Sequence, residues 1–421
     1  MNNNDLKNKD LLSFEWDLDQ KEYNKPPISI FKDKNNTSKG IDDINNFDKN
    51  IIEDKINNLG VGCKIVSVKL GPQVTTFIID LNQDSNVRML SKILIDLQLF
   101  LKCKKMPNLV YEVPGTPYCA LEVPNIKKGI VNFKDIISRD EYINKDGKLL
   151  CAIGKTTLGE IYTDDIVFMP HALICGMSGS GKTILLNNII MNLIIKYSPE
   201  DVRLMLIDYR EFELTPYNNL PHVLFNKSLS NPEEIWNAFR WINFETQRRY
   251  KILSENKYHR IDEYNNEQGV EKLPRIVIII DEASLLIDNI KYGRDLVNCI
   301  NTLSKIGRII GIHIILSTQN TIKSIITPEI QNNLITKMVL TVSDERDSLI
   351  AMKEKGAENL LGCGDMIVKK GPKKTRVQVS YVDIEDIKNI CKYIIENNKW
   401  IKNNENINSI LTGEFFKNLK D

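Results

Sequence analysis

The sequence has no long apolar run, no strong excess of charge of either sign and no closely spaced pairs of cysteines. No apolar run approaches the roughly 20 residues that a membrane-spanning helix needs, and residues 1–20 contain no apolar signal core. We therefore expect a cytoplasmic protein without a membrane segment of its own. The formal net charge is only +1. Because many nucleic-acid-binding proteins carry a basic excess, any contact with a polyanion must here come from a local patch or from repetition in an assembly.

The cysteines and histidines show no metal-binding pattern. The eight cysteines are scattered, and several fall within apolar, strand-like runs. This distribution is typical of reduced, buried thiols in a cytoplasmic protein. The histidines do not have the spacing of zinc ligands; they are His171, His222, His259 and His313. We therefore interpret both residue types as structural.

The first part of the chain predicts an arm and a small domain. Residues 1–48 are rich in Asn, Asp and Lys and poor in apolar residues, which predicts a disordered polar arm with a short docking element around Phe14 and Trp16. Residues 49–150 predict a small α+β domain. Two strand-like runs flank the turn signal at residues 71–72, an amphipathic helix follows, and two further strand-like runs flank a Pro-Gly turn.

Residues 151–400 predict a larger α/β domain, and residues 401–421 predict a polar C-terminal tail. Short, nearly continuous runs of Ile, Val and Leu alternate here with longer helical patterns. Strands of this kind are usually covered on both faces, as in a parallel sheet flanked by helices. The predicted strands are 172–175, 203–208, 275–281, 313–318 and 337–342. Residues 369–376, KKGPKKTR, form the tip of a predicted hairpin, either as a solvated turn or as a contact for DNA or another subunit.

The stretch HALICGMSGSGKTILLNNII places a glycine-rich segment between two apolar runs. Its middle fits G-x-x-x-x-G-K-[ST], with a predicted strand before it and a predicted helix after it. The eight positions are Gly176, Met177, Ser178, Gly179, Ser180, Gly181, Lys182 and Thr183. Glycines allow successive N–H groups to point at one phosphate, and the helix N-terminus adds partial positive charge. We therefore predict ATP binding here, with Lys182 on the β- and γ-phosphates and the Thr183 hydroxyl on Mg²⁺.

A second predicted strand ends in an acidic pair. The run RIVIIIDEASLLID presents Asp281 and Glu282 at the C-terminal end of the strand, where ligand sites of such sheets lie. We expect Asp281 to hold Mg²⁺, directly or through water, and Glu282 to orient and deprotonate the attacking water. The next strand ends in Thr318 and Gln319. Gln319 is predicted either to sense the γ-phosphate or to be a turn residue.

Several longer stretches resemble the FtsK/SpoIIIE family of DNA translocases. They include MPHALICGMSGSGKT, LPHVL, RIVIIIDEASLL, GIHIILSTQ, GAENLLGCGDMIV and, in the small domain, EVPGTPYCALEVPN, and together they cover roughly residues 58–395. The resemblance implies RecA-like ATPase domains in a hexameric ring that pumps double-stranded DNA through its channel. It also implies that Arg308, just before GIH, is an arginine finger that reaches the nucleotide of a neighbouring subunit. Its local position alone indicates only a cation at a helix end.

The sequence departs from the family pattern at positions that the family associates with DNA grip. Asn320 replaces an arginine, and Gln331 and Glu345 replace lysines. Because each phosphate contact releases counterions, these losses predict weaker DNA binding with a flatter dependence on salt. Three nearby cations are candidate replacements: Lys323, Lys337 and Arg346. We also expect neither the family's transmembrane N-terminus nor its winged-helix domain, so a DNA-targeting partner would have to read DNA orientation.

Three functions are compatible with this sequence. The first is an ATP-driven motor that moves double-stranded DNA through a cytoplasmic ring for a plasmid, phage or other mobile element. The second is a coupling ATPase that delivers a nucleoprotein or protein cargo to a membrane channel, which the replaced basic positions favour. The third is a nucleotide-gated assembly module. Glu282 argues against the third function, because a switch has less need of a catalytic base.

Overall fold

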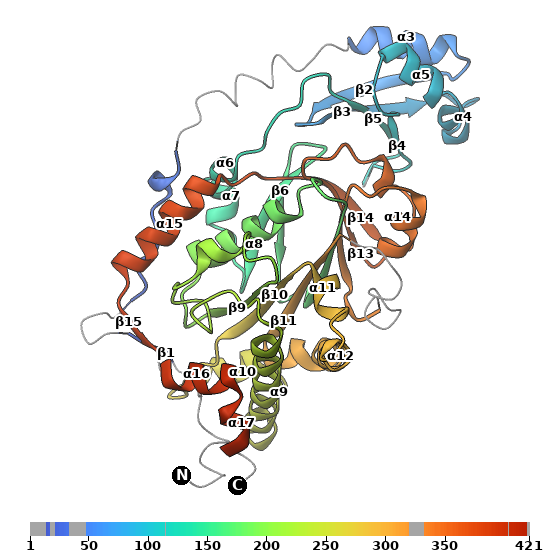
Figure 1. The fold of residues 1–421 in the computed structure, drawn as a ribbon. Helices are drawn as coiled ribbons and strands as arrows, with labels where there is room; N and C mark the ends of the chain where they lie inside the picture. The colour runs from blue at the N-terminus through green and yellow to red at the C-terminus, as the bar shows by residue number, and fades with distance from the viewer. Residues whose placement is uncertain are drawn as a thin grey trace.

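The computed structural model describes residues 14–16, 22–32, 48–113, 115–319, 332–402 and 404–418. A small unit of strands and helices lies at one end of a larger unit that is built on a central sheet (Figure 1). The described part of the larger unit contains a nine-stranded sheet, and that of the small unit contains a four-stranded sheet. The docking element expected around Phe14 and Trp16 is strand β1 (Phe14–Trp16), which pairs with β15 (Trp400–Lys402) near the other end of the chain.

The central sheet has the strand order β7-β6-β14-β13-β12-β8-β11-β10-β9. The strands from β12 to β9 run parallel to one another, and those from β13 to β7 extend the sheet in antiparallel fashion. The strands are β6 (Leu150–Thr156), β7 (Ile161–Asp165), β8 (His171–Cys175), β9 (Val202–Asp208), β10 (Arg275–Asp281), β11 (Ile312–Thr318), β12 (Thr336–Leu340), β13 (Asp365–Lys370) and β14 (Lys373–Val379).

Strand β10 shows why the central strands are continuously apolar. Val277 and Ile279 belong to one apolar core, whereas Ile276, Ile278 and Ile280 belong to another. Successive side chains of a strand point to opposite faces, so a strand that is covered on both sides needs apolar residues at every position. The predicted fold class, a parallel α/β sheet flanked by helices, is therefore confirmed.

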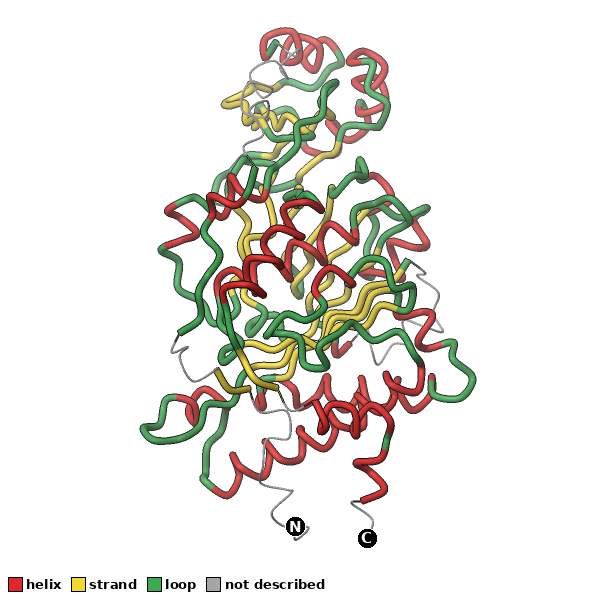
Figure 2. Tube along the Cα trace, turned by 60° about the vertical axis from the view of Figure 1, so that its left-hand side comes forward, coloured by secondary structure: helices red, strands yellow, loops and turns green. Residues whose placement is uncertain are grey.

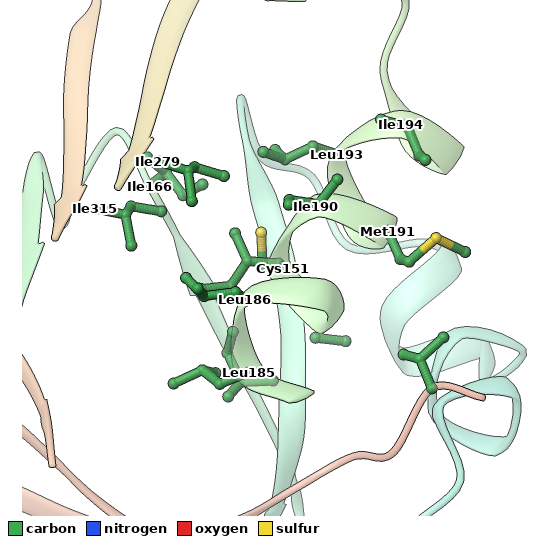
Figure 3. Close-up of a cluster of buried hydrophobic side chains, with 14 of the residues drawn as sticks. Cys151, Ile166, Leu185, Leu186, Ile190, Met191, Leu193, Ile194, Ile279 and Ile315 are labelled. Atoms are coloured by element: carbon green, nitrogen blue, oxygen red, sulfur yellow. The ribbon is translucent and has the colours of Figure 1, made fainter. Parts of the chain in front are cut away.

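Helices cover both faces of this sheet (Figure 2). In Figure 3, Leu186 and Leu193 lie on the side of α8 toward Ile279 of β10 and Ile315 of β11, whereas Met191 points away from them. Helices α9 and α12 contribute to the core on the opposite face. The helices of the larger unit are α6 (Phe133–Ile137), α7 (Asp140–Ile143), α8 (Lys182–Lys196), α9 (Pro232–Glu255), α10 (Ile261–Asn265), α11 (Ala283–Ile287), α12 (Gly293–Ile310), α14 (Glu345–Met352), α15 (Ile384–Asn397), α16 (Asn404–Thr412) and α17 (Glu414–Asn418). Among the described residues, no helix combines the length and the apolar character needed to cross a membrane.

The small unit has an antiparallel sheet of order β2-β3-β5-β4. Its strands are β2 (Cys63–Leu70), β3 (Val74–Leu81), β4 (Asn108–Val110) and β5 (Cys119–Pro124), and its helices are α3 (Lys49–Asn58), α4 (Val87–Lys92) and α5 (Leu94–Leu101). The single helix expected after β3 is thus two helices that meet at Ile93. The unit has its own apolar core, to which Ile65, Phe77 and Leu121 contribute.

Several segments complete cores outside the domains in which we expected them. Phe133 and Tyr142, from a stretch expected in the small domain, belong to the same core as α8. Phe31, from the arm expected to be disordered, also packs in that core. In the expected polar tail, Ile410 of α16 packs in the core that contains α9. Each segment has too few apolar residues for a core of its own, but it adds to one that the central sheet has already built.

Candidate active site

The phosphate-loop motif connects the buried strand β8 to helix α8. Gly179 and Gly181 have left-handed φ angles of 73° and 112°, a region that favours glycine. Space also requires glycine at position 181, because an added Cβ would lie 2.8 Å from the backbone nitrogen of Gly364. The loop therefore winds tightly onto the N-terminus of α8, where unpaired helix N–H groups attract anions.

Two polar side chains of the loop, those of Ser180 and Lys182, are buried. The buried Lys182 ammonium donates hydrogen bonds to the carbonyl oxygens of Gly176 (2.7 Å) and Met177 (3.0 Å). Burial lowers the pKa of Lys182, although Glu282 and other anions oppose the shift. The Ser180 hydroxyl is buried and has no hydrogen-bond partner within the described part of the chain. A polyanion such as a triphosphate would give the Ser180 hydroxyl a hydrogen-bond partner and the Lys182 ammonium an opposite charge.

The carboxyl edge of the central sheet brings acidic side chains together. Asp281 ends β10, in register with Asp208 at the end of β9. Burial and the neighbouring carboxylates of Asp208, Glu213 and Glu282 raise the pKa of Asp281 to about 6. Such a concentration of buried and half-buried carboxylates is stabilised by a cation. Together with the hydroxyl of Thr183 in the first turn of α8, Asp281 offers the oxygen ligands that Mg²⁺ prefers, so these residues fit that ion.

Glu282 is tied to the end of the neighbouring strand β11. Its side chain is 4% exposed, and its carboxylate accepts hydrogen bonds from the hydroxyl groups of Ser284 (2.5 Å) and Thr318 (3.2 Å). The main-chain N–H of Gln319 donates to the same carboxylate at 3.2 Å. Glu282 also has a left-handed φ of 51°, a conformation that costs a non-glycine residue energy and is common at functional sites. Glu282, the candidate general base, is therefore in direct contact with the main chain of Gln319, the candidate sensor.

Two residues of this cluster were not predicted as site residues. Ser284 is part of the local sequence DEAS, in which the hydroxyl lies close enough to fold back onto Glu282. Asp208 is the last residue of its predicted strand, and its carboxylate accepts hydrogen bonds from the main-chain N–H groups of Arg210, Glu213 and Leu214. The strand-end position of Asp208 was a signal that could have identified it.

Arg308 lies far from the candidate site of its own chain. It occupies the exposed last turn of α12, after which β11 runs from Ile312 to Thr318 to reach the site. A strand of this length spans about 20 Å at roughly 3.3 Å per residue. Arg308 therefore cannot contact a nucleotide bound in its own chain.

The positions linked to DNA grip are only partly within the described residues. Three of them lie outside: Asn320, Lys323 and Gln331. Glu345 begins α14 and forms an ion pair with Lys355 at 2.7 Å. Lys337 is only 7% exposed, and burial lowers its pKa, so it is poorly placed to replace a surface lysine. Arg346 is exposed on α14, so burial does not argue against it as a replacement for the lost lysines.

The lysines of the predicted basic hairpin are largely paired with acidic residues. Lys369 and Lys374 both form ion pairs with Glu354 at 2.5 Å. Lys370 forms an ion pair with Asp164 of β7. The hairpin of β13 and β14 therefore presents less free positive charge than its sequence indicates.

Comparison with known proteins matches nearly the whole chain to one family. The sequence model of the FtsK/SpoIIIE family matches residues 132–358, and that of the FtsK alpha domain matches residues 26–125. A DNA translocase FtsK from Clostridium tetani is 33% identical over 385 residues, which are 89% of this chain and 51% of the relative. A DNA translocase FtsK from Staphylococcus epidermidis is 32% identical over 392 residues, which are 90% of this chain and 48% of the relative. The chain thus spans about half the length of these curated relatives.

Solved structures with low sequence identity share the fold. The monomer form of the pCW3 conjugation coupling protein TcpA, with ATPγS, has a TM-score of 0.58 and 20% identity, and the match covers 83% of this chain and 99% of TcpA. The cytoplasmic domain of the type VII secretion ATPase EccC from Thermomonospora curvata has a TM-score of 0.56 and 21% identity over 64% of this chain and 34% of EccC. These structures show the fold, and the match of the family model over residues 132–358 shows that this chain belongs to the FtsK/SpoIIIE family of P-loop ATPases.

Proposed function

We propose that this chain is an ATP-hydrolysing motor that moves double-stranded DNA through a ring of its own copies. The observation that carries this proposal is the juxtaposition of the buried Lys182 and Glu282 with the half-buried Asp281 at the carboxyl edge of the central sheet. The matched relatives are named DNA translocases, which supports DNA as the polymer. The setting that we propose is a plasmid, phage or other mobile element.

In this proposal the phosphate loop and the acidic edge divide the work of binding ATP. The N–H groups of the loop bind phosphate oxygens, and Lys182 exchanges its carbonyl partners for the β- and γ-phosphates. Thr183 and Asp281 hold Mg²⁺, which would neutralise part of the phosphate charge when bound. This arrangement requires Asp281 in its ionised form.

The ends of β10 and β11 then act on the γ-phosphate. Glu282 orients the attacking water and accepts its proton. To reach that water, Glu282 must give up at least one of its hydrogen bonds to Ser284 and Thr318. Gln319 senses the γ-phosphate, and its contact with Glu282 links sensing to the position of the base.

Assembly into a hexameric ring completes the site in this proposal. Arg308 cannot reach the nucleotide of its own chain, but it lies on an exposed helix end that a neighbouring copy can contact. A head-to-tail contact that closes into a ring would place Arg308 of one copy beside the phosphate loop of the next. An arginine supplied in this way stabilises the transition-state charge and can raise the rate by about 10³–10⁵.

The test is ATP hydrolysis by the purified full chain with and without linear duplex DNA at low salt. We expect duplex DNA to stimulate the steady-state rate several-fold. K182A, which removes the phosphate-binding ammonium, is the control and should abolish hydrolysis in both conditions. A rate that is the same with and without duplex DNA contradicts the proposal.

A coupling ATPase that delivers a nucleoprotein or protein cargo to a membrane channel is a second candidate. The burial of Lys337 and the pairing of Glu345 with Lys355 favour it, because both reduce the positive charge available for DNA. Recovery of a membrane protein in a pull-down, together with hydrolysis that ignores DNA, would support this function. A nucleotide-gated assembly module instead predicts a single turnover of ATP without steady-state cycling.

A further inference from the structure

One loop of the larger unit contacts both the phosphate loop and the small unit. We call residues 360–364 the bridge loop. On one side, the N–H of Gly364 donates to the carbonyl oxygen of Ser180 at 2.7 Å. The backbone of Gly364 also lies so close to Gly181 that a Cβ at position 181 would not fit. A change in the path of the phosphate loop must therefore move the bridge loop or break this hydrogen bond.

Side chains from residues 73–128 hold the other side of the bridge loop. They donate hydrogen bonds to consecutive carbonyl oxygens, so the loop cannot move freely while the small unit stays in place. The bonds run from Lys105 to Leu360 (2.7 Å), from Lys128 to Leu361 (2.9 Å), and from Gln73 to Gly362 (3.4 Å) and Cys363 (3.3 Å).

A buried ion-pair network fixes the end of the bridge loop. Arg376 of β14 donates to both carboxylate oxygens of Asp365, at 2.9 and 2.6 Å, directly after the bridge loop. The same guanidinium donates to Glu122 of β5, in the small unit, at 2.6 Å. Glu122 and Asp365 are only 2% and 3% exposed. Buried charge-assisted bonds are strong, and removal of one member leaves the others uncompensated.

The contact between the two units is polar. The apolar core of the small unit and the two cores of the larger unit share no residue among those described. Gln73 and Gln378 line a small cavity between the units, and within the described residues the side-chain carbonyl oxygen of each has no partner. Polar contacts of this kind rearrange more readily than an apolar core. The relative position of the units therefore depends on polar contacts, which include the hydrogen bonds of the bridge loop, the ion pairs of Arg376 and the bond from the Thr76 hydroxyl to the carbonyl oxygen of Thr157 at 3.2 Å.

We propose that the small unit controls nucleotide binding through the bridge loop, with Arg376 and Glu122 as positioning residues for the phosphate loop. Phosphate binding fixes the path of the phosphate loop. The hydrogen bond from Gly364 to Ser180 then holds the bridge loop in place, and the bridge loop in turn holds the side chains of the small unit that bond to it. Linkage is reciprocal: docking of the small unit strengthens nucleotide binding by the same factor by which nucleotide binding strengthens docking, so loosening the dock weakens nucleotide binding. The inference rests on nucleotide binding and not on DNA movement, so its failure is distinguishable from failure of the motor proposal.

The first test compares two variants of the full chain. E122Q removes the charge but keeps the size of the small-unit partner of Arg376. E354Q removes a carboxylate that pairs with Lys369 and Lys374 of the same hairpin, away from the bridge loop. By titration calorimetry, we expect the dissociation constant of ATPγS with Mg²⁺ to rise about fivefold or more in E122Q and to stay unchanged in E354Q.

A second pair of variants decides the matter if E122Q does not fold. Lys128 is exposed and bonds the bridge loop, whereas its neighbour Lys127 is exposed and does not bond this loop. K128A should weaken ATPγS binding about two- to threefold, and K127A should leave it unchanged. In the wild type, ATPγS should also slow amide hydrogen exchange around Gln73, and K128A should reduce this protection.

A merely structural contact would lower thermal stability without changing nucleotide affinity. The inference is therefore overturned if E122Q or K128A melts at a lower temperature but binds ATPγS as the wild type does. Equal weakening in K127A and K128A, or absence of nucleotide-dependent protection around Gln73 in the wild type, overturns it as well.

Discussion

Binding of nucleotide with Mg²⁺ should weaken steeply below pH 6, because Asp281 must lose its proton to hold the ion. Burial and the carboxylates of Asp208, Glu213 and Glu282 raise the pKa of Asp281 from 3.8 to about 6. Only the ionised carboxylate is a good metal ligand. The ionised fraction falls from nearly all at pH 7.5 to about one in eleven at pH 5. The dissociation constant should therefore be about tenfold higher at pH 5 than at pH 7.5.

The assay is calorimetric binding of ATPγS with Mg²⁺ between pH 5 and pH 8, in the wild type and in D281N. The substitution removes the titrating group, so the difference between the two profiles separates Asp281 from titration of the nucleotide and of other carboxylates. We expect the wild type to bind ATPγS with Mg²⁺ more tightly than D281N at neutral pH. This difference in affinity should disappear as the pH falls, with a midpoint near pH 6. A difference between the two profiles that stays constant down to pH 5, as an ordinary pKa of 3.8 for Asp281 predicts, would refute the reasoning from burial and repulsion.

Three further predictions concern the base, the core and the DNA contact. S284A removes the 2.5 Å hydrogen bond to Glu282 and should raise DNA-independent ATP hydrolysis about threefold or more; an unchanged steady-state rate would mean that this bond does not restrain the base. Burial lowers the pKa of His171 from 6.5 to about 4. Between these two pH values the unfolded chain binds more protons at this residue than the folded chain does. The folded state therefore loses stability as the pH falls from neutral through this range. The loss is about 2 kcal/mol at pH 5; thermal unfolding at pH 7.5 and pH 5 measures it, and H171L should lose this part of the pH dependence. E345K restores a basic residue and should steepen the slope of log affinity for duplex DNA against log salt by about 0.9; equal slopes would mean that this position does not meet DNA.

The placement of the phosphate loop and of the acidic pair could be predicted from the sequence because local residues determine both. Gly179 and Gly181 adopt backbone conformations that other residues avoid, and their spacing from Lys182 is part of a known motif. Asp281 follows an apolar run that is buried on both faces, which fixes it at the end of a central strand. That these residues bind ATP and Mg²⁺ remains a prediction.

The contacts that organise the site could not be predicted, because they join residues that are far apart in the sequence. Thr318 lies 36 residues from Glu282, and Arg376 lies 254 residues from Glu122. The same reason explains why Phe31 was assigned to a disordered arm. The composition of its segment does not reveal that a core formed by α8 and α15 is available to bury it.

The central claim is that a neighbouring copy completes the site that hydrolyses ATP in response to duplex DNA. Mixing K182A with R308A tests this claim most directly. Each variant alone should lack DNA-stimulated hydrolysis, the first because phosphate binding is lost and the second because the arginine finger is lost. An equimolar mixture should recover hydrolysis that depends on duplex DNA, because Arg308 of a K182A copy can reach the intact site of an R308A neighbour. A mixture no more active than the mean of the two separate variants would contradict the account.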